Sequence, residues 1–331
     1  MSREALARAA SEGEPRSDGE TSVTADADAA LSALLDAGLT FPGAAEIAAR
    51  FLPQVTALSE GVSAVLLYGS TLWSSVRGNS SYPDFIVIID SFRGWRRGWV
   101  DSLWGALLPP TVYRLRDGDA YAKLCVATSG QLAAQTSAEA KDLHLAGRLS
   151  KRVALVWSRD ELERRRLVAA QAAALKTMAR LVLNRFPGSV ALDAFMLALL
   201  GLSYQSEIRI QEPGKIQALF TVEQDHYRAV GRALLATLGA VPLDRDGTRF
   251  QLPAGSAVPA ADTRRLLRRS RRRAYLRWPK YLATYDGWLD YLLAKLARSG
   301  GPVVLTERQR RHPFIFALPV LYRMYRTRRV G

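Results

Sequence analysis

The order of hydrophobic and polar positions divides the chain into a mixed first half and a mostly helical second half. Two short apolar runs, 62–68 ("VSAVLLY") and 84–90 ("DFIVIID"), predict buried strands, the second rich in β-branched residues. Segment 111–128 places "DGD" between two strand-like arms and predicts a hairpin. A further strand is expected in "RVALVW" at 152–157.

Apolar residues at helical spacing predict two helices within 29–55, another over 131–149 and mostly helix from 160 to about 240. Segment 241–262 contains several Pro, Gly and Asp residues and predicts a linker or a small hairpin. The expected fold class is therefore mixed α/β (α+β). In the helix expected within 91–108, Trp95, Trp99 and Trp104 are spaced by four and five and predict a stripe of core residues.

Charge is distributed unevenly along the chain. The net charge is +15, and residues 261–331 hold 18 Lys and Arg against 4 Asp and Glu, so the rest of the chain is nearly neutral. A basic module of this kind favours anionic lipid or nucleic acid as a partner. A single cysteine, Cys125, and the scattered His144, His226 and His312 give no metal-ligand spacing.

The first 26 residues are polar and are expected to be disordered. Residues 1–22 lack an apolar core and include acidic residues, so neither a signal peptide nor a transit peptide is expected. No apolar run approaches the roughly 20 residues that a membrane span needs. The sequence therefore predicts a cytosolic protein or one attached to the membrane from its cytoplasmic face.

Gly69 and Ser70 end the first apolar run, and Asp84 opens the second. This layout is that of DNA polymerase beta-like nucleotidyltransferases, in which a Gly-Ser turn binds a triphosphate and strand carboxylates hold Mg²⁺. Such strands usually carry a second carboxylate two residues after the first, but here that position is Ile86. Asp90 lies about 20 Å along the strand from Asp84, which is too far for the two to bind the same ion. A tight structural turn with a capping aspartate is the alternative.

Six stretches, in order, resemble the mitochondrial translocator assembly and maintenance family, the mitochondrial-type CDP-diacylglycerol synthases. They are "LYGSTLW" at 67–73, "DFIVIID" at 84–90, "TVYR" at 111–114, "AKLCV" at 122–126, "LAGRLSKRV" at 145–153 and "LGLSYQSEIRI" at 200–210. Their order and spacing agree over about residues 45–230. The chain departs from the family at Thr71, where the family has a second glycine, and at 205–207, where it has Ser-Gly-Asp.

The resemblance implies a nucleotidyltransferase domain over 27–160 and a helical, winged-helix-like second domain with its linker over 161–260. It also implies a basic amphipathic membrane-associating tail over 261–331. The implied activity is that of a phosphatidate cytidylyltransferase, which transfers CMP from CTP to phosphatidic acid and releases pyrophosphate for phospholipid synthesis. Mg²⁺ or another divalent cation is the implied cofactor, and the implied partners are phosphatidic acid, CTP and an anionic membrane rather than nucleic acid.

The matched positions give the expected site. Asp84 and Lys123 are the expected catalytic residues, and Asp84 is also the expected metal ligand. The expected nucleotide contacts are Gly69, Ser70, Thr71, Arg148, Lys151, Ser203 and Arg209. Each has a structural alternative: Lys123 as an outward lysine on an edge strand, and Arg148 and Lys151 as charges at a helix C-terminus. Asp117 and Asp119 are candidates for a second carboxylate, although turn chemistry also explains them.

The tail supplies the expected membrane contacts. Segment 281–297 places its large apolar side chains on one helical face, and 313–322 is apolar but broken by Pro319. Aromatic rings beside arginines suit a lipid headgroup boundary. The expected contacts are Trp288, Arg308, Arg310, Arg311, Phe314, Phe316, Arg323 and Arg326. Packing of 281–297 on the second domain is the alternative for that helix.

Two other functions remain open from the sequence. One is a nucleotidyltransferase that acts on RNA or on a soluble small molecule, with the basic module binding nucleic acid. The other is a catalytically inactive membrane-bound scaffold, because Thr71 and the arginines after Trp95 replace residues that the family has there.

Overall fold

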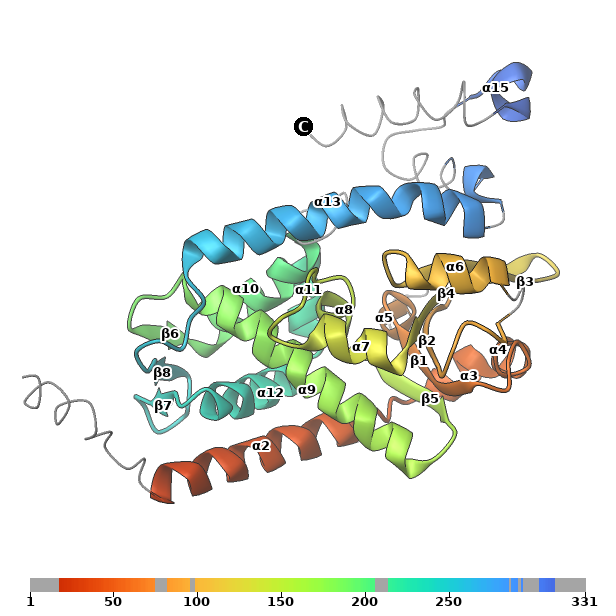
Figure 1. Cartoon of the computed structure of the whole chain (residues 1–331). Helices are drawn as coiled ribbons and strands as arrows, with labels where there is room; N and C mark the ends of the chain where they lie inside the picture. Colours follow the sequence, from red (N-terminus) through yellow and green to blue (C-terminus); the bar gives the residue numbers. More distant parts are fainter. Residues whose placement is uncertain are drawn as a thin grey trace, which may run out of the picture.

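The computed structural model describes residues 18–74, 82–95, 99–205, 214–285, 287–290, 293 and 304–312. It is a mixed α/β protein built on a five-stranded sheet with the strand order β3-β4-β2-β1-β5 (Figure 1). The strands are β1 Val62–Tyr68, β2 Asp84–Ile89, β3 Thr111–Asp117, β4 Ala120–Thr128 and β5 Ala154–Ser158. The predicted fold class and the predicted strands are confirmed.

Strand directions in this sheet are mixed. Strand β1 runs antiparallel to both of its neighbours, β2 and β5. The predicted hairpin is β3 and β4, which pair antiparallel, while β4 runs parallel to β2. Because β1 and β2 are antiparallel and Tyr68 lies opposite Asp84, the C-terminal end of β1 lies beside the N-terminal end of β2.

The helices surround this sheet and extend away from it. Their bounds are α2 Asp18–Gly38, α3 Ala44–Ala49, α4 Leu52–Thr56, α5 Thr71–Ser74, α6 Trp99–Ala106, α7 Ser129–Thr136, α8 Ala146–Leu149, α9 Glu161–Leu183, α10 Leu192–Gln205, α11 Lys215–Val222, α12 Gln224–Thr237, α13 Ala260–Thr284 and α15 Glu307–Arg311. A small sheet of order β6-β8-β7 joins β6 Ser189–Ala191, β7 Val241–Pro242 and β8 Arg249–Gln251. It confirms the hairpin alternative predicted for 241–262 and adds β6 to it.

Local sequence signals start the helices that follow β4 and β5. Thr128 accepts a hydrogen bond from the Gln131 backbone N–H, and the Gln131 side chain accepts one from the Thr128 N–H, which forms a capping box for α7. Asp160 accepts from the Glu163 N–H and caps α9. These caps fix where the chain leaves the sheet and turns onto its face.

The sheet is buried on both faces. One face packs with α3 and α4 and with Trp95. The other belongs to a larger core that continues from β1, β2 and β4 through α8 and α9 into α10 and α12. This larger core joins the segments expected as a nucleotidyltransferase domain and as a helical second domain. In Figure 1 the sheet lies on one side, α10, α12 and the small sheet lie on the other, and α9 crosses between them.

Three segments differ from the sequence-based expectation. Helix α2 begins at Asp18, so residues 18–26 are helical although they were expected to be disordered. The helix expected over 131–149 is two shorter helices, α7 and α8, joined by a connection. Trp95 is buried but precedes α6, and Trp99 is 77% exposed, so the predicted tryptophan core stripe is wrong at Trp99.

The basic C-terminal region begins with a docked helix. In Figure 1, helix α13 runs above α10, α11 and α6 and below α15. It ends at Thr284, and Tyr285 has an extended backbone, so the single helix expected over 281–297 is interrupted there. A small apolar cluster of Tyr285, Trp288 and Leu305 with α13 packs against Val112 of β3. The described apolar residues of this segment therefore pack against β3 of the large sheet.

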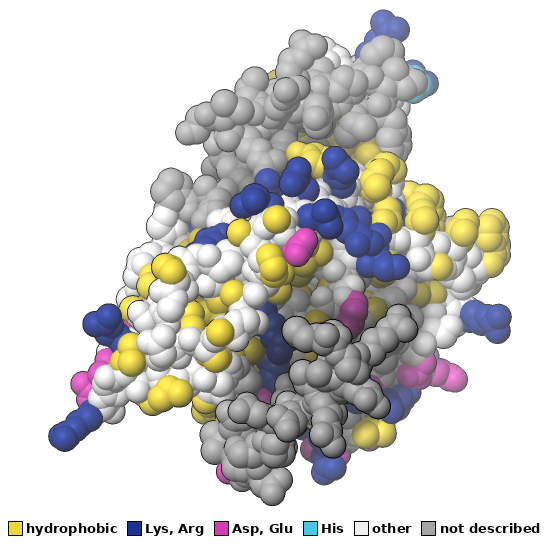
Figure 2. Space-filling model, turned by 60° about the vertical axis from the view of Figure 1, so that its left-hand side comes forward, with side chains coloured by type: hydrophobic (Ala, Val, Ile, Leu, Met, Phe, Trp, Pro, Cys, Tyr) yellow, Lys and Arg dark blue, Asp and Glu magenta, His cyan; other side chains and the backbone are white. Residues whose placement is uncertain are grey.

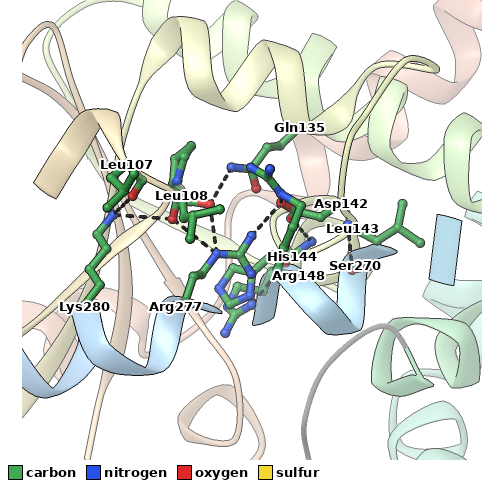
Figure 3. A network of polar contacts seen from close by, with 12 residues as sticks. Leu107, Leu108, Gln135, Asp142, Leu143, His144, Arg148, Ser270, Arg277 and Lys280 are labelled. Atoms are coloured by element: carbon green, nitrogen blue, oxygen red, sulfur yellow. Dashed lines mark hydrogen bonds and ion pairs between the residues drawn. The ribbon is translucent and has the colours of Figure 1, made fainter. Parts of the chain in front are cut away.

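A set of polar contacts that we call the α13 network holds this helix in place (Figure 3). Its members are Asp142, Arg273, Arg277 and Lys280. Asp142 accepts hydrogen bonds from Arg273 at 2.7 Å and from Arg277 at 2.6 Å. Lys280 donates to the Leu107 carbonyl at 2.6 Å, at the end of α6. Arg273 and Arg277 thus bind α13 to the α7–α8 connection, and Lys280 binds it to the end of α6. Within the described residues, no helix is long and apolar enough to cross a membrane.

Candidate functional site

A row of four polar side chains crosses neighbouring strands of the large sheet. Tyr68 of β1 lies opposite Asp84 of β2. Asp84 in turn lies opposite Lys123 of β4, which lies opposite Arg114 of β3. Tyr68 and the alternate neighbours of Asp84 and Lys123 belong to the core shared with α8 and α9, whereas Tyr113 packs on the other face. These four residues, which we call the polar row, therefore share one face of the sheet.

Gly69 brings the end of β1 close to the carboxylate of the polar row. Its φ of +85° favours glycine. A Cβ at this position would lie 3.2 Å from Asp84 Oδ2, so the site leaves little room for a side chain. Ser70 follows and is exposed, and Thr71 is buried at the start of α5. The predicted Gly-Ser turn therefore lies directly beside Asp84.

Asp84 and Lys123 form a long ion pair. The distance from Lys123 Nζ to Asp84 Oδ1 is 3.9 Å, and the side chains are 17% and 30% exposed respectively. The Lys123 backbone N–H donates to the Pro83 carbonyl at 3.0 Å, which fixes the strand register at this point. Lys123 is thus not an outward lysine on an edge strand, because β4 lies between β3 and β2.

Arg148 of α8 lies over the β1 end of the row. Its Nε donates to the Tyr68 hydroxyl at 3.1 Å, and its guanidinium lies 5.4 Å from the centroid of that ring. Burial raises the pKa of Tyr68 to about 12, although nearby Arg148 opposes the shift. Tyr68 therefore stays protonated at neutral pH and holds Arg148 beside the row without adding negative charge.

Residues of α10 contact the same short helix, α8. A Cβ on Gly147 would lie 3.3 Å from Ser203 Cβ, so α8 and α10 approach closely there. Ser203 is buried and donates to the Leu200 carbonyl at 2.7 Å. Lys151 Nζ lies 4.0 Å from the centroid of the Tyr204 ring. Helix α10 therefore packs against α8, next to the sheet. Ser203 is part of this packing and does not line an open surface.

The other predicted site residues fall in different places. Trp288 is buried in the apolar cluster against β3, so its ring is not at the surface expected for a lipid contact. Arg308, Arg310 and Arg311 are exposed on α15. The remaining predicted contacts lie outside the described residues; they are Arg209, Phe314, Phe316, Arg323 and Arg326.

Of the two candidate second carboxylates, Asp119 is exposed in the β3–β4 turn and Asp117 forms an ion pair away from the polar row. Asp117 pairs with Arg50, and its position on β3 places it on the sheet face opposite the polar row. Asp90 pairs with Arg159 at the far end of β2. Among the described residues, no group of three or more His, Cys, Asp and Glu side chains is arranged to hold a metal ion.

The residues around Asp84 suit Mg²⁺ only if a bound phosphate supplies further ligands. Mg²⁺ often keeps several waters and binds proteins through one or two carboxylates together with substrate phosphates. Asp84 supplies one such carboxylate, and Lys123 beside it favours an anion as the second partner. A divalent ion that arrives with a polyphosphate therefore suits the site better than one held by protein ligands alone.

Two parts of this site were not predicted. Tyr68 and Arg114 join the polar row, and the Arg114 guanidinium lies 4.3 Å from the centroid of the Tyr121 ring. That ring stacks on Tyr82, with 3.7 Å between centroids. The "DGD" turn pairs Asp117 with Ala120, so counting outward from it would have placed Arg114 opposite Lys123.

Lys123 lies beside Asp84 at the glycine turn, with Arg148 at the β1 end of the row and Arg114 on the strand beyond Lys123. Three cations to one anion favour binding of a ligand with several negative charges. No model of a protein family matches this chain, and neither does any curated protein.

Proposed function

We propose that this protein is a phosphatidate cytidylyltransferase of the CDP-diacylglycerol synthase type. The observation that carries the proposal is the polar row, in which Asp84 lies between the Gly69 turn and Lys123. The cations of the row and Arg148 supply positive charge for a triphosphate, and the resemblance of the six stretches supplies the reaction. The protein would act as a peripheral membrane protein on the cytoplasmic face, because phosphatidic acid is held in the bilayer.

The reaction asks for little covalent chemistry from the protein. A phosphate oxygen of phosphatidic acid forms a bond to the α-phosphorus of CTP. The bond from that phosphorus to the oxygen bridging to the β-phosphate breaks, and pyrophosphate leaves with the electron pair. Because the attacking oxygen is already anionic, no general base is required, and catalysis consists of positioning and charge stabilisation.

Each residue has a role in that scheme. Lys123 and Arg114 bind the triphosphate oxygens, and Arg148, held by Tyr68, adds charge from above the row. The backbone at Gly69 and Ser70 lets the phosphates approach closely. Asp84 would hold Mg²⁺, which neutralises the triphosphate when bound.

The test is turnover of CTP labelled on its α-phosphate, with vesicles that contain phosphatidic acid. We expect CDP-diacylglycerol and pyrophosphate only when the lipid is present. Asp84→Asn should reduce turnover by about a thousandfold, because it removes an anionic metal ligand without changing size. The matched control is Asp90→Asn, on the same strand but paired with Arg159 at its far end, which should stay within about twofold of the native rate.

Other outcomes would reject the proposal. Transfer of the nucleotide to RNA or to an aminoglycoside in place of the lipid would identify a different nucleotidyltransferase. Binding of CTP without transfer to any of these acceptors would identify an inactive scaffold. Equal losses from Asp84→Asn and Asp90→Asn would show that the polar row is not the reaction centre.

A further inference from the structure

Helix α6 presents an apolar face to the outside of the molecule. Trp99, Leu103 and Leu107 follow one another at intervals of four residues and are 77%, 62% and 50% exposed. Residues at this spacing lie on one side of a helix. Single exposed apolar residues are ordinary, but three large ones in one line are not. We call these three residues the α6 ridge.

The opposite side of α6 is fixed to the protein. Asp101 is fully buried and accepts a hydrogen bond from the Tyr113 hydroxyl at 2.9 Å. Gly105 lies against the Phe92 ring so closely that a Cβ has no room. The inward side of α6 therefore holds the polar and small residues, and the ridge cannot turn inward without breaking these contacts.

The ridge adjoins a basic helix. The Leu107 carbonyl accepts from Lys280, so the end of α6 is bound to the C-terminal half of α13. On α13, Tyr275 and Leu276 are exposed and extend the apolar surface. The N-terminal half of the helix exposes six arginines and the acidic Asp262, which pairs with Arg265. The arginines are Arg264, Arg265, Arg268, Arg269, Arg271 and Arg272. In Figure 2, Lys and Arg side chains gather in the upper part of the face shown, with hydrophobic side chains beside them.

We propose that the α6 ridge enters the interface of an anionic membrane while the outer arginines of α13 bind the lipid headgroups. An anionic bilayer offers apolar depth and negative charge on the same surface. Nucleic acid would match the arginines but would leave the ridge in water. A second copy of this chain could cover the ridge, but a twofold contact would bring the two arginine surfaces together.

This arrangement places the lipid beside the polar row. Strand β3 is the edge strand that carries Arg114, the outer member of the row. Helix α6 contacts β3 through Asp101 and Tyr113, and α13 contacts it through Thr284, which donates to the Val112 carbonyl at 2.7 Å. The ridge thus adjoins the sheet edge at which the row ends, from the face opposite the row, and the exposed arginines follow in the N-terminal half of α13. The inference rests on the proposed function for the location of the substrate, and its test needs neither CTP nor turnover.

A probe on the ridge provides the test, because the native cysteine, Cys125, is completely buried. Leu103→Cys is labelled with a dye whose emission shifts to the blue in apolar surroundings. The matched control is Leu162→Cys on α9, at an apolar residue that is 55% exposed. With vesicles of phosphatidylcholine and phosphatidylglycerol we expect a blue shift at position 103 only, and none with phosphatidylcholine alone.

Binding is then measured by sedimentation with the same vesicles. Leu103→Glu combined with Leu107→Glu should weaken binding at least tenfold, and Leu162→Glu should leave it unchanged. Urea unfolding checks that each variant is folded. Equal shifts at both probes, or sedimentation without a shift at position 103, would overturn the proposal. A blue shift that appears without vesicles and grows with protein concentration would also overturn the proposal, because it would indicate a second copy of the chain on the ridge. A blue shift produced by an RNA duplex would overturn it as well.

A protein that binds vesicles through the ridge but transfers no nucleotide to lipid would refute the proposed function alone. A protein that makes CDP-diacylglycerol while its ridge probe stays in water would refute this inference alone.

Discussion

The polar row and the α13 network each place a single carboxylate among basic side chains, two in the row and three in the network, yet their distances differ. In the network, Asp142 is 1% exposed and its Oδ2 lies 2.6 Å and 2.7 Å from two arginine nitrogens. Its other oxygen, Oδ1, accepts from the His144 backbone N–H at 3.1 Å. In the row, Asp84 is 30% exposed and lies 3.9 Å from Lys123 Nζ.

That difference indicates what each cluster is for. A buried charge needs short contacts to every neighbour, because an unmet hydrogen bond inside the protein is costly. The α13 network meets this requirement and joins distant parts of the chain. In the polar row the Asp84–Lys123 pair is longer and partly exposed, and positive charge exceeds negative charge, as the proposed binding of an anion requires. Two clusters of similar charged residues can therefore have different roles.

The largest effect should come from removing the network carboxylate. Asp142→Ala leaves Arg277 and Arg273 without their shared partner and should lower the free energy of unfolding by about 3–5 kcal/mol. Asp84→Ala removes a half-exposed partner and should change it by less than about 1 kcal/mol. Urea unfolding of both variants measures the two values. If both substitutions lowered the free energy of unfolding by the same amount, the two clusters would not differ in their contribution to stability.

The next effect concerns pH. Burial, with Arg277 nearby, lowers the pKa of Lys280 to about 7. Between this value and the pKa of a lysine in the unfolded chain, about 10.4, the unfolded state binds more protons, so stability rises with pH. We expect a gain of about 2 kcal/mol from pH 7 to pH 9, and Lys280→Met should abolish it. The measurement is the urea midpoint of the native protein and of Lys280→Met between pH 7 and pH 9. If the two midpoints change with pH in the same way, Lys280 stays charged in the folded protein.

A smaller effect should come from the cations of the row. Lys123→Ala and, separately, Arg114→Ala each remove a charged donor to the triphosphate and should raise the apparent KM for CTP about tenfold. Their unfolding free energies should change little. Lys176→Ala, at a lysine of α9 paired with Asp28, is the control and should leave KM unchanged. An unaltered KM in both row variants would mean that the triphosphate binds elsewhere.

The smallest change in stability should come from the outer face of α13. Arg269→Ser combined with Arg272→Ser should alter unfolding by less than about 0.5 kcal/mol, because both side chains are exposed. Binding to anionic vesicles should weaken about thirtyfold at low salt, at about 1 kcal/mol for each of the two arginines near the surface. The exposed pair Arg165→Ser and Arg166→Ser on α9 is the comparison. If it weakens vesicle binding as much, net charge rather than position is responsible.

Much of the fold was predictable because short local patterns of apolar and turn residues determine it. Strand β1 occupies the apolar run 62–68 as predicted, and "DGD" joins β3 to β4. The site was predictable where pattern and register coincide, as at Gly69, Asp84 and Lys123. Arg114 was within reach of the same register argument. Tyr68 was not, because its role depends on Arg148, 80 residues away in the sequence.

The basic C-terminal region shows where local pattern is insufficient. The sequence by itself determined the charge of residues 261–331 and the apolar character of α6. Only the tertiary structure decided which cations bind Asp142 and carbonyl oxygens and which remain outside. It also decided that Trp95 is buried while Trp99 is exposed. The physical reason is that burial is a property of the neighbours: a side chain is inside only if another segment covers it, and those segments come from distant parts of the chain.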